Sequence, residues 1–205
     1  IKPLGVVLPK DTNDVLSLME YSQKNSVPLL ARGGGSSQCG QTVGESVVLD
    51  YSKHQNKILE LNVEEKYVWV QPGVVLDHLN DYLKPHGLWF PVDVSTSSRA
   101  TIGGMSANNS CGSRSLYYGN MVHNVLAIEA ILDDGSIFQF DQINKNYLAT
   151  KNNQDRLYKI IDKFIDVRQK VGSEIDANWP TTQRRVGGYN IDLIDPCLLY
   201  TSDAA

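Results

Sequence analysis

Short apolar runs and one helical repeat alternate along the first thirty residues of the chain. Val6–Leu8 has the size of a strand, and the apolar positions within Val15–Met19 recur at helical spacing behind a capping residue, Asp11 or Thr12. Pro28–Ala31 then has the composition of a buried strand. A strand–helix–strand order with a right-handed crossover predicts that these two strands belong to a parallel sheet.

The remaining apolar pattern predicts a mixture of strands and helices. The predicted strands are Ser46–Asp50, Ile58–Leu61, Tyr67–Val70, and a hairpin of Val125–Leu132 with Ile137–Phe140 around a Gly-containing turn. The predicted helices are about Val74–Leu83 and one marked by Leu157, Ile160, Ile161, Phe164 and Val167. Pro91–Asn120 shows neither period, and loop-like stretches of this length inside a domain are usually functional or disordered. The pattern as a whole predicts an α+β fold.

Composition narrows the class of protein. The 205 residues suffice for one large domain or two small lobes, with 41% hydrophobic residues, 20% charged residues and a net charge of -4. Without a cluster of Lys and Arg, a nucleic-acid partner is not expected. No apolar stretch is long enough for a transmembrane segment.

Cysteine and histidine positions predict no metal site. Cys39, Cys111 and Cys197 form no CxxC pair and are too few to ligate an iron–sulfur cluster by themselves. The four histidines lack metal-ligand spacing, and only His123 is placed near a candidate ligand-binding turn. We expect a reducing, cytoplasmic location, with the full-length protein peripheral to a membrane at most.

The strongest local signal is the glycine-rich run Arg32–Gln38, directly after a predicted strand. Backbone N–H groups of successive glycines can converge on an anion, and flanking Ser hydroxyls add donors, which suits a pyrophosphate. The GxGxxG motif fails because Gln38 occupies its last Gly position. The GxxxxGK[ST] motif fails because Gln41 replaces the Lys before Thr42. On this run alone, a plain tight loop is an equally good interpretation.

A second signal lies about seventy residues further on, within Ala100–Ser113. Its Gly103-Gly104 pair is followed by small polar residues, which suits a backbone pressed against a flat or phosphorylated ligand. Alone, this segment could equally be a turn. Together with the first run and with Pro91-Val92-Asp93, it is much more specific.

On these motifs the chain resembles the FAD-binding PCMH-type domain shared by vanillyl-alcohol oxidase-like and D-lactate dehydrogenase-like flavoproteins. The resemblance is strongest to the FAD/FMN-containing dehydrogenases of the D-lactate, glycolate and D-2-hydroxyglutarate group, and it covers about Pro3–Leu193. Pro3–Pro9 resembles the family's first strand, Tyr118–Asn120 a turn after the central segment, and Arg185–Asn190 a stretch near the flavin ring.

The resemblance implies a set of FAD-contacting residues. They are Arg32, Gly33, Gly34, Gly35, Ser36, Ser37, Gln38, Pro91, Asp93, Ser97, Thr101, Gly103, Gly104, Asn108, Ser110, Gly112 and Gly119. Some relatives tether the flavin covalently through a His in the first loop. Because Ser36 and Ser37 stand there, we expect non-covalent FAD. The protein would position the flavin and tune its electronics.

The resemblance also implies a domain organisation and an activity. We expect an FAD-binding domain over 1–193, with lobes of about 1–70 and 71–193 around the FAD, and a tail at 194–205 outside the family. The substrate domain, with the catalytic residues, is expected to be absent, so that the fragment is inactive and binds FAD weakly or not at all. The full-length protein would oxidise a small 2-hydroxy acid and pass electrons to a quinone, a cytochrome or an iron–sulfur centre.

Two alternatives remain open on the sequence. One is a non-catalytic nucleotide- or phosphate-binding module that uses only the loop at Gly33–Gln38. The other is an FAD domain like that of UDP-N-acetylenolpyruvoylglucosamine reductase, although the run Ala107–Ser113 fits the hydroxy-acid group better. Flavin absorbance would count against the first alternative.

Overall fold

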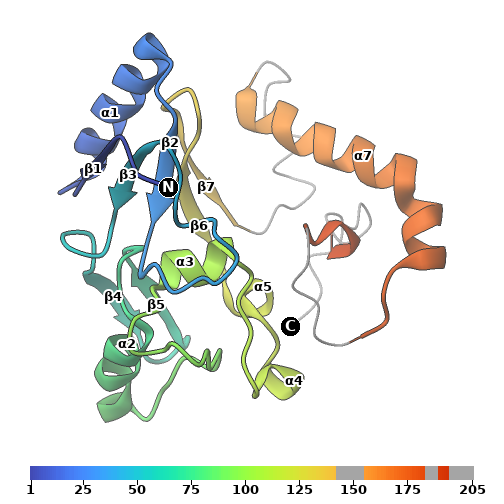
Figure 1. Ribbon diagram of the computed structural model, residues 1–205. Helices are drawn as coiled ribbons and strands as arrows, with labels where there is room; N and C mark the ends of the chain where they lie inside the picture. Colours follow the sequence, from blue (N-terminus) through green and yellow to red (C-terminus); the bar gives the residue numbers. More distant parts are fainter. Residues whose placement is uncertain (142–154, 183–188, 194–205) are drawn as a thin grey trace. The chain divides into compact units, whose positions relative to one another are not determined.

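A small parallel sheet forms at the start of the chain (Figure 1). In the computed structural model, which describes residues 1–141, 155–182 and 189–193, β1 (Gly5–Val7), β2 (Leu29–Arg32) and β3 (Val47–Asp50) pair in the order β1-β3-β2. Both outer strands run parallel to β3. The predicted parallel sheet is therefore confirmed, and the third predicted strand lies between the first two.

The connection between β1 and β2 is α1 (Thr12–Asn25). The carboxylate of Asp11 caps it, because Oδ1 accepts hydrogen bonds from the backbone N–H groups of Asn13 at 2.8 Å and Asp14 at 3.2 Å. Of the two capping residues considered from the sequence, Asp11 is thus the one used. The helix ends at Ser26, which adopts a left-handed conformation with φ 53°.

A hairpin and a helix follow. β4 (Ile58–Asn62) and β5 (Tyr67–Val70) are antiparallel, and α2 (Leu76–Leu83) continues into the 3-10 turn η1 (Lys84–His86). The buried side chains of Val74, Leu79 and Leu83 pack against apolar residues of both strands. The predicted strands and helix are confirmed here to within two residues.

The segment without apolar periodicity holds two short helices, α3 (Ile102–Ala107) and α4 (Ser115–Tyr118), and a third, α5 (Met121–Asn124), follows directly after it. Their lengths are six, four and four residues. Helices of one or two turns are too short to show a helical period, so pattern analysis assigned them to loop. A core cluster of Leu76, Val92, Ala100, Met105 and Met121 anchors this segment.

The described chain divides into two compact units, and the elements above belong to Ile1–Val125 with Asp133–Gly135. The other unit contains the hairpin of β6 (Ile128–Ile131) and β7 (Ile137–Phe140), then α7 (Arg156–Asn178) and the turn η2 (Ile191–Leu193). The predicted hairpin and long helix are confirmed, with the first strand starting at Ile128. The predicted lobes around FAD stay a prediction.

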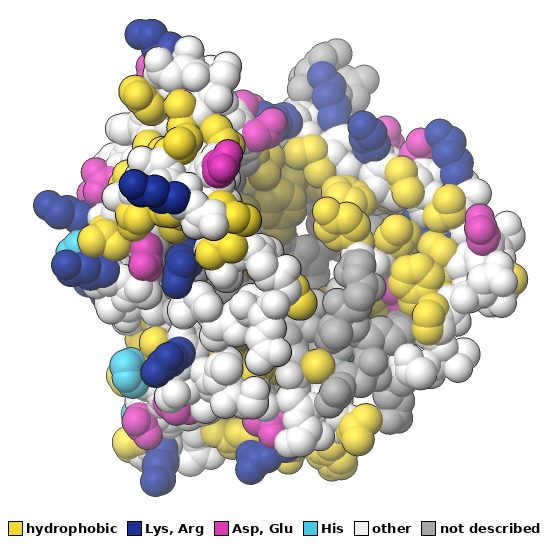
Figure 2. Space-filling view, viewed as in Figure 1, with side chains coloured by type: hydrophobic (Ala, Val, Ile, Leu, Met, Phe, Trp, Pro, Cys, Tyr) yellow, Lys and Arg dark blue, Asp and Glu magenta, His cyan; other side chains and the backbone are white. Residues whose placement is uncertain are grey.

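The sequence has no cluster of Lys and Arg, and the surface view agrees with this. On the face shown in Figure 2, Lys and Arg side chains are scattered among Asp and Glu side chains. Among the described residues, no helix combines the length and apolarity that crossing a bilayer requires, and no cluster of His, Cys, Asp and Glu could hold a metal ion.

Candidate functional site

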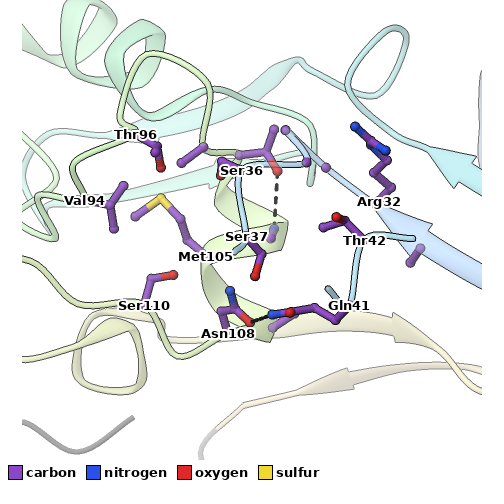
Figure 3. A pocket seen from close by; sticks show the side chains of 18 residues that line it. Arg32, Ser36, Ser37, Gln41, Thr42, Val94, Thr96, Met105, Asn108 and Ser110 are labelled. Atoms are coloured by element: carbon purple, nitrogen blue, oxygen red, sulfur yellow. Dashed lines mark hydrogen bonds between the residues drawn. The ribbon is translucent and has the colours of Figure 1, made fainter. Parts of the chain in front are cut away.

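An open cavity of about 200 Å³ lies in the first unit, where the loop after β2 meets the segment around α3 (Figure 3). Predicted residues that line it are Arg32, Gly33, Gly34, Gly35, Ser36, Ser37, Thr101, Gly104, Asn108 and Ser110. Lining residues outside that predicted set are Ala31, Gln41 and Thr42 of the first loop region, and Val94, Thr96, Ala100, Met105 and Ala107, which fall inside the segment Pro91–Gly112 expected to contact FAD. The structure thus brings together, around one cavity, the two glycine-containing segments that lie about seventy residues apart in the sequence.

The loop after β2 presents a series of unused backbone donors. The last sheet hydrogen bond at this end runs from Tyr51 N–H to the Arg32 carbonyl, at 3.0 Å. In the described structure, none of the backbone N–H groups from Gly33 to Gln38 donates to another residue. Several adjacent donors without protein acceptors form a concave site for an anion.

Glycine is needed in this loop because the second segment lies directly against it. A Cβ atom at position 34 would overlap the carbonyl oxygen of Arg99, and one at position 33 would overlap the Thr101 hydroxyl. Thr101 is itself fixed, since its hydroxyl accepts from Gly104 N–H at the start of α3. Side chains at 33 and 34 would therefore push the two walls of the cavity apart.

The chemistry of the lining suits a phosphate group. Hydroxyls, two side-chain amides and the Arg32 guanidinium line the cavity, and no Asp or Glu is among its lining residues. A carboxylate-free lining is notable in a chain with a net charge of -4. Val94, Ala100 and Met105 add an apolar wall, so the cavity can accept a ligand with both phosphate and apolar parts.

Gln41 and Asn108 join the two sides of the cavity. The Gln41 Nε2 donates to the Asn108 Oδ1 at 2.9 Å, as the dashed line in Figure 3 shows. Gln41 and Thr42 belong to the imperfect GxxxxGK[ST] run, which sequence analysis set aside because it lacks the Lys. The partial match to that motif was the feature of the sequence that could have indicated these two residues as part of a phosphate-binding site.

The other predicted site residues lie outside the cavity lining. They are Gln38, Pro91, Asp93, Ser97, Gly103, Gly112 and Gly119. Asp93 holds the turn before α4: its carboxylate accepts from Ser113 Oγ at 2.7 Å and from Arg114 N–H at 2.9 Å. A Cβ at Gly112 would overlap the Asp93 carbonyl oxygen, so this turn also depends on a close approach.

The folded environment of Asp93 shifts the pKa of its carboxyl. Partial burial acts to raise the pKa of its carboxyl, but the hydrogen bonds from Ser113 and Arg114, together with the Arg114 charge, outweigh it and lower the pKa below its ordinary value. The same Arg114 guanidinium lies 5.0 Å from the centre of the Trp89 ring.

Asp93→Asn is expected to destabilise the protein at neutral pH and to matter less in acid. A carboxyl with a lowered pKa stabilises the fold fully above its unfolded pKa and loses that contribution as pH falls through the folded pKa. The side chain is 29% exposed, so screening limits the loss to about 1 kcal/mol. Urea unfolding from about pH 7 to about pH 3 measures it. A difference between wild type and variant that stays constant with pH would contradict this account.

Histidine chemistry does not reach the cavity. His123 is exposed, and its Nδ1 accepts from Asn120 N–H at 3.1 Å as part of the cap of α5. It is not among the lining residues. The predicted ring-adjacent stretch Arg185–Asn190 lies largely outside the described residues, and Cys197 and the tail at 194–205 lie there entirely.

Comparison with known proteins shows to which family this chain belongs. Residues 3–141 match the model of the FAD binding domain. The chain belongs to this family. A parallel sheet with a glycine-rich loop against a short helix is therefore the fold of an FAD-binding domain, and the resemblance drawn from the motifs is confirmed.

Relatives of this FAD-binding domain are dehydrogenases of 2-hydroxy acids. The D-2-hydroxyglutarate dehydrogenase of Haemophilus influenzae is 41% identical over 199 residues, with 92% of this chain and 19% of that protein covered. The mitochondrial cytochrome-type D-lactate dehydrogenase of Kluyveromyces lactis is 40% identical over 140 residues, covering 66% of this chain and 24% of that protein. The chain thus spans about a fifth of the length of the D-2-hydroxyglutarate dehydrogenases that it matches.

A solved structure supports the fold. The 6-hydroxy-D-nicotine oxidase of Arthrobacter nicotinovorans superimposes with a TM-score of 0.62 at 19% identity, covering 70% of this chain and 31% of that one. At this identity the match concerns the fold alone. The donor-rich, carboxylate-free lining fits the pyrophosphate of FAD, and the contacts of individual residues with it stay predictions.

Proposed function

We propose that this chain forms the FAD site of an oxidoreductase that converts a small 2-hydroxy acid of the D-lactate, glycolate or D-2-hydroxyglutarate class to the 2-oxo acid. The observation that carries the proposal is the cavity after β2, whose two glycine-dependent walls offer donors and no carboxylate. The dehydrogenases similar to this chain support the substrate class.

In this proposal the residues of the cavity bind and orient the cofactor. The free N–H groups of Gly33–Ser37, with the hydroxyls of Ser36, Ser37 and Thr42, hold the pyrophosphate. Val94 and Met105 pack against a less polar part of the cofactor. Ser36 and Ser37 stand in the loop where some relatives carry the His that links the flavin, so the proposed attachment is non-covalent.

In this proposal the substrate's proton acceptor lies outside the residues that line the cavity. Bound FAD would supply the hydride acceptor for C2 of the hydroxy acid, and the hydroxyl proton would pass to a base. No histidine or carboxylate lines the cavity, and the Asp93 carboxylate is engaged by Ser113 and Arg114. The electrons then pass to a quinone, a cytochrome or an iron–sulfur centre, in the cytoplasm or at its membrane surface.

Titration of the purified chain with FAD, followed by flavin fluorescence, tests the proposal. Saturable binding is expected for the wild type. Ser36→Glu places a carboxylate in the lining and is expected to weaken binding by about tenfold or more, through repulsion of the phosphates in a partly enclosed site.

Val43→Glu is the matched control. Val43 is 49% exposed, lies in the same loop and does not line the cavity, so its variant should bind FAD as the wild type does. Absence of saturable FAD binding by the wild type, or equal weakening by both glutamates, would count against this cavity as the FAD site.

A further inference from the structure

The hydrogen bond between Gln41 and Asn108 orients a cavity residue. Asn108 is the C-cap of α3, where its backbone N–H donates to the Gly104 carbonyl at 3.2 Å, so its main chain is fixed. Its side chain is exposed and can rotate. The bond of 2.9 Å from Gln41 Nε2 to Asn108 Oδ1 is the contact that selects one side-chain orientation among the described residues.

This contact decides which end of the Asn108 amide faces the cavity. Because Oδ1 accepts from Gln41, the Nδ2 end with its two donors is left for a ligand. Figure 3 shows the Asn108 nitrogen turned toward Ser37, inside the ring of lining residues. A rotation by half a turn would present the carbonyl oxygen instead, which repels an anion.

We propose that Gln41 is a positioning residue that holds Asn108 with its Nδ2 donors facing a phosphate of the bound cofactor. The inference rests on the proposed function, since it assumes that FAD occupies this cavity. Gln41 acts through Asn108, and Asn108 makes the contact.

Gln41→Met tests the proposal because it keeps the length of the side chain and removes the donor. With FAD and with ADP as probes, Gln41→Met is expected to raise the Kd by about tenfold, as for loss of one hydrogen bond to a charged group. Riboflavin, which has no phosphate, is expected to bind both proteins equally. Val43→Met, two residues along the loop and outside the lining, is the matched control and should change no affinity.

A second variant separates positioning from direct contact. In an Asn108→Ala background, Gln41→Met is expected to cause no further loss of FAD affinity, because the residue through which it acts is gone. The melting temperature of the ligand-free protein should stay at the wild-type value in Gln41→Met, since the hydrogen bond is exposed.

The outcomes distinguish the two proposals. Unchanged FAD affinity in Gln41→Met, additive losses in the double variant, or an equal loss for riboflavin would each overturn the positioning role and leave the FAD site intact. If the wild type binds neither FAD nor ADP, the proposed function fails and the positioning role fails with it.

Discussion

Gly34→Asp is expected to abolish FAD binding by this chain. A Cβ at position 34 would overlap the Arg99 carbonyl oxygen, so the loop must move away from the segment before α3. The carboxylate would also add a negative charge among the donors assigned to the pyrophosphate. Together these effects are expected to weaken FAD binding by at least about a hundredfold, more than any single lost hydrogen bond would.

Two further variants divide this effect into its parts. Gly34→Ala retains the overlap without the charge and should show an intermediate Kd in the same fluorescence titration. Gly44→Asp adds the same side chain to the same loop, where a Cβ would lie 3.5 Å from Ser46 Oγ, an ordinary contact. It should bind FAD like the wild type. If Gly34→Asp binds FAD as tightly as Gly44→Asp, the loop at 33–37 is not part of the site.

The elements with a strong apolar period could be predicted from the sequence, and those without one could not. Tyr67–Val70 was found because it is a continuous apolar run bounded by polar residues, and the helix that became α7 because its apolar side chains recur at helical spacing. The three helices between Ile102 and Asn124 were missed because each is shorter than two full turns. Their conformation depends on tertiary contacts such as the bond from Ile102 N–H to the Val74 carbonyl, at 2.8 Å.

The candidate site shows the same division. The run at Gly33–Ser37 carries its own signal, because successive glycines are rare except where the backbone closely approaches something. Val94 and Met105 carry no such signal, since nothing local distinguishes an apolar residue of a cavity wall from one of the core. Met105 is both: it lines the cavity and is 2% exposed within the core cluster.

Glycine and aspartate are also ambiguous signals. Gly112 and Asp93 were predicted to contact FAD. They lie outside the lining of this cavity, their close approach shapes the turn before α4, and their contact with FAD stays a prediction. A glycine demanded by a neighbouring carbonyl and one demanded by a ligand look alike in a sequence. A Cβ at either Gly34 or Gly112 would meet a neighbouring carbonyl oxygen, and what distinguishes Gly34 is that it also lines the cavity.

Leu76→Ala, in the core that the cavity wall rests on, is expected to cause the second large effect, a loss of stability. Leu76 is 1% exposed, packs in the cluster with Val92 and Met105, and donates its backbone N–H to the Ala100 carbonyl at 3.0 Å. Truncation leaves a cavity in a cluster that the site shares, since Ala100 and Met105 also line the site. We expect the free energy of unfolding to fall by about 2–5 kcal/mol.

Urea unfolding measures this loss, and Leu116→Ala provides the comparison. Leu116 lies on α4 with its side chain 64% exposed, so the same truncation should lower the free energy of unfolding by less than about 0.5 kcal/mol. Because the cavity wall rests on the Leu76 cluster, only Leu76→Ala should also weaken FAD binding. Equal losses of stability in the two variants would mean that this cluster does not support the segment around α3, and the cavity would need another source of rigidity.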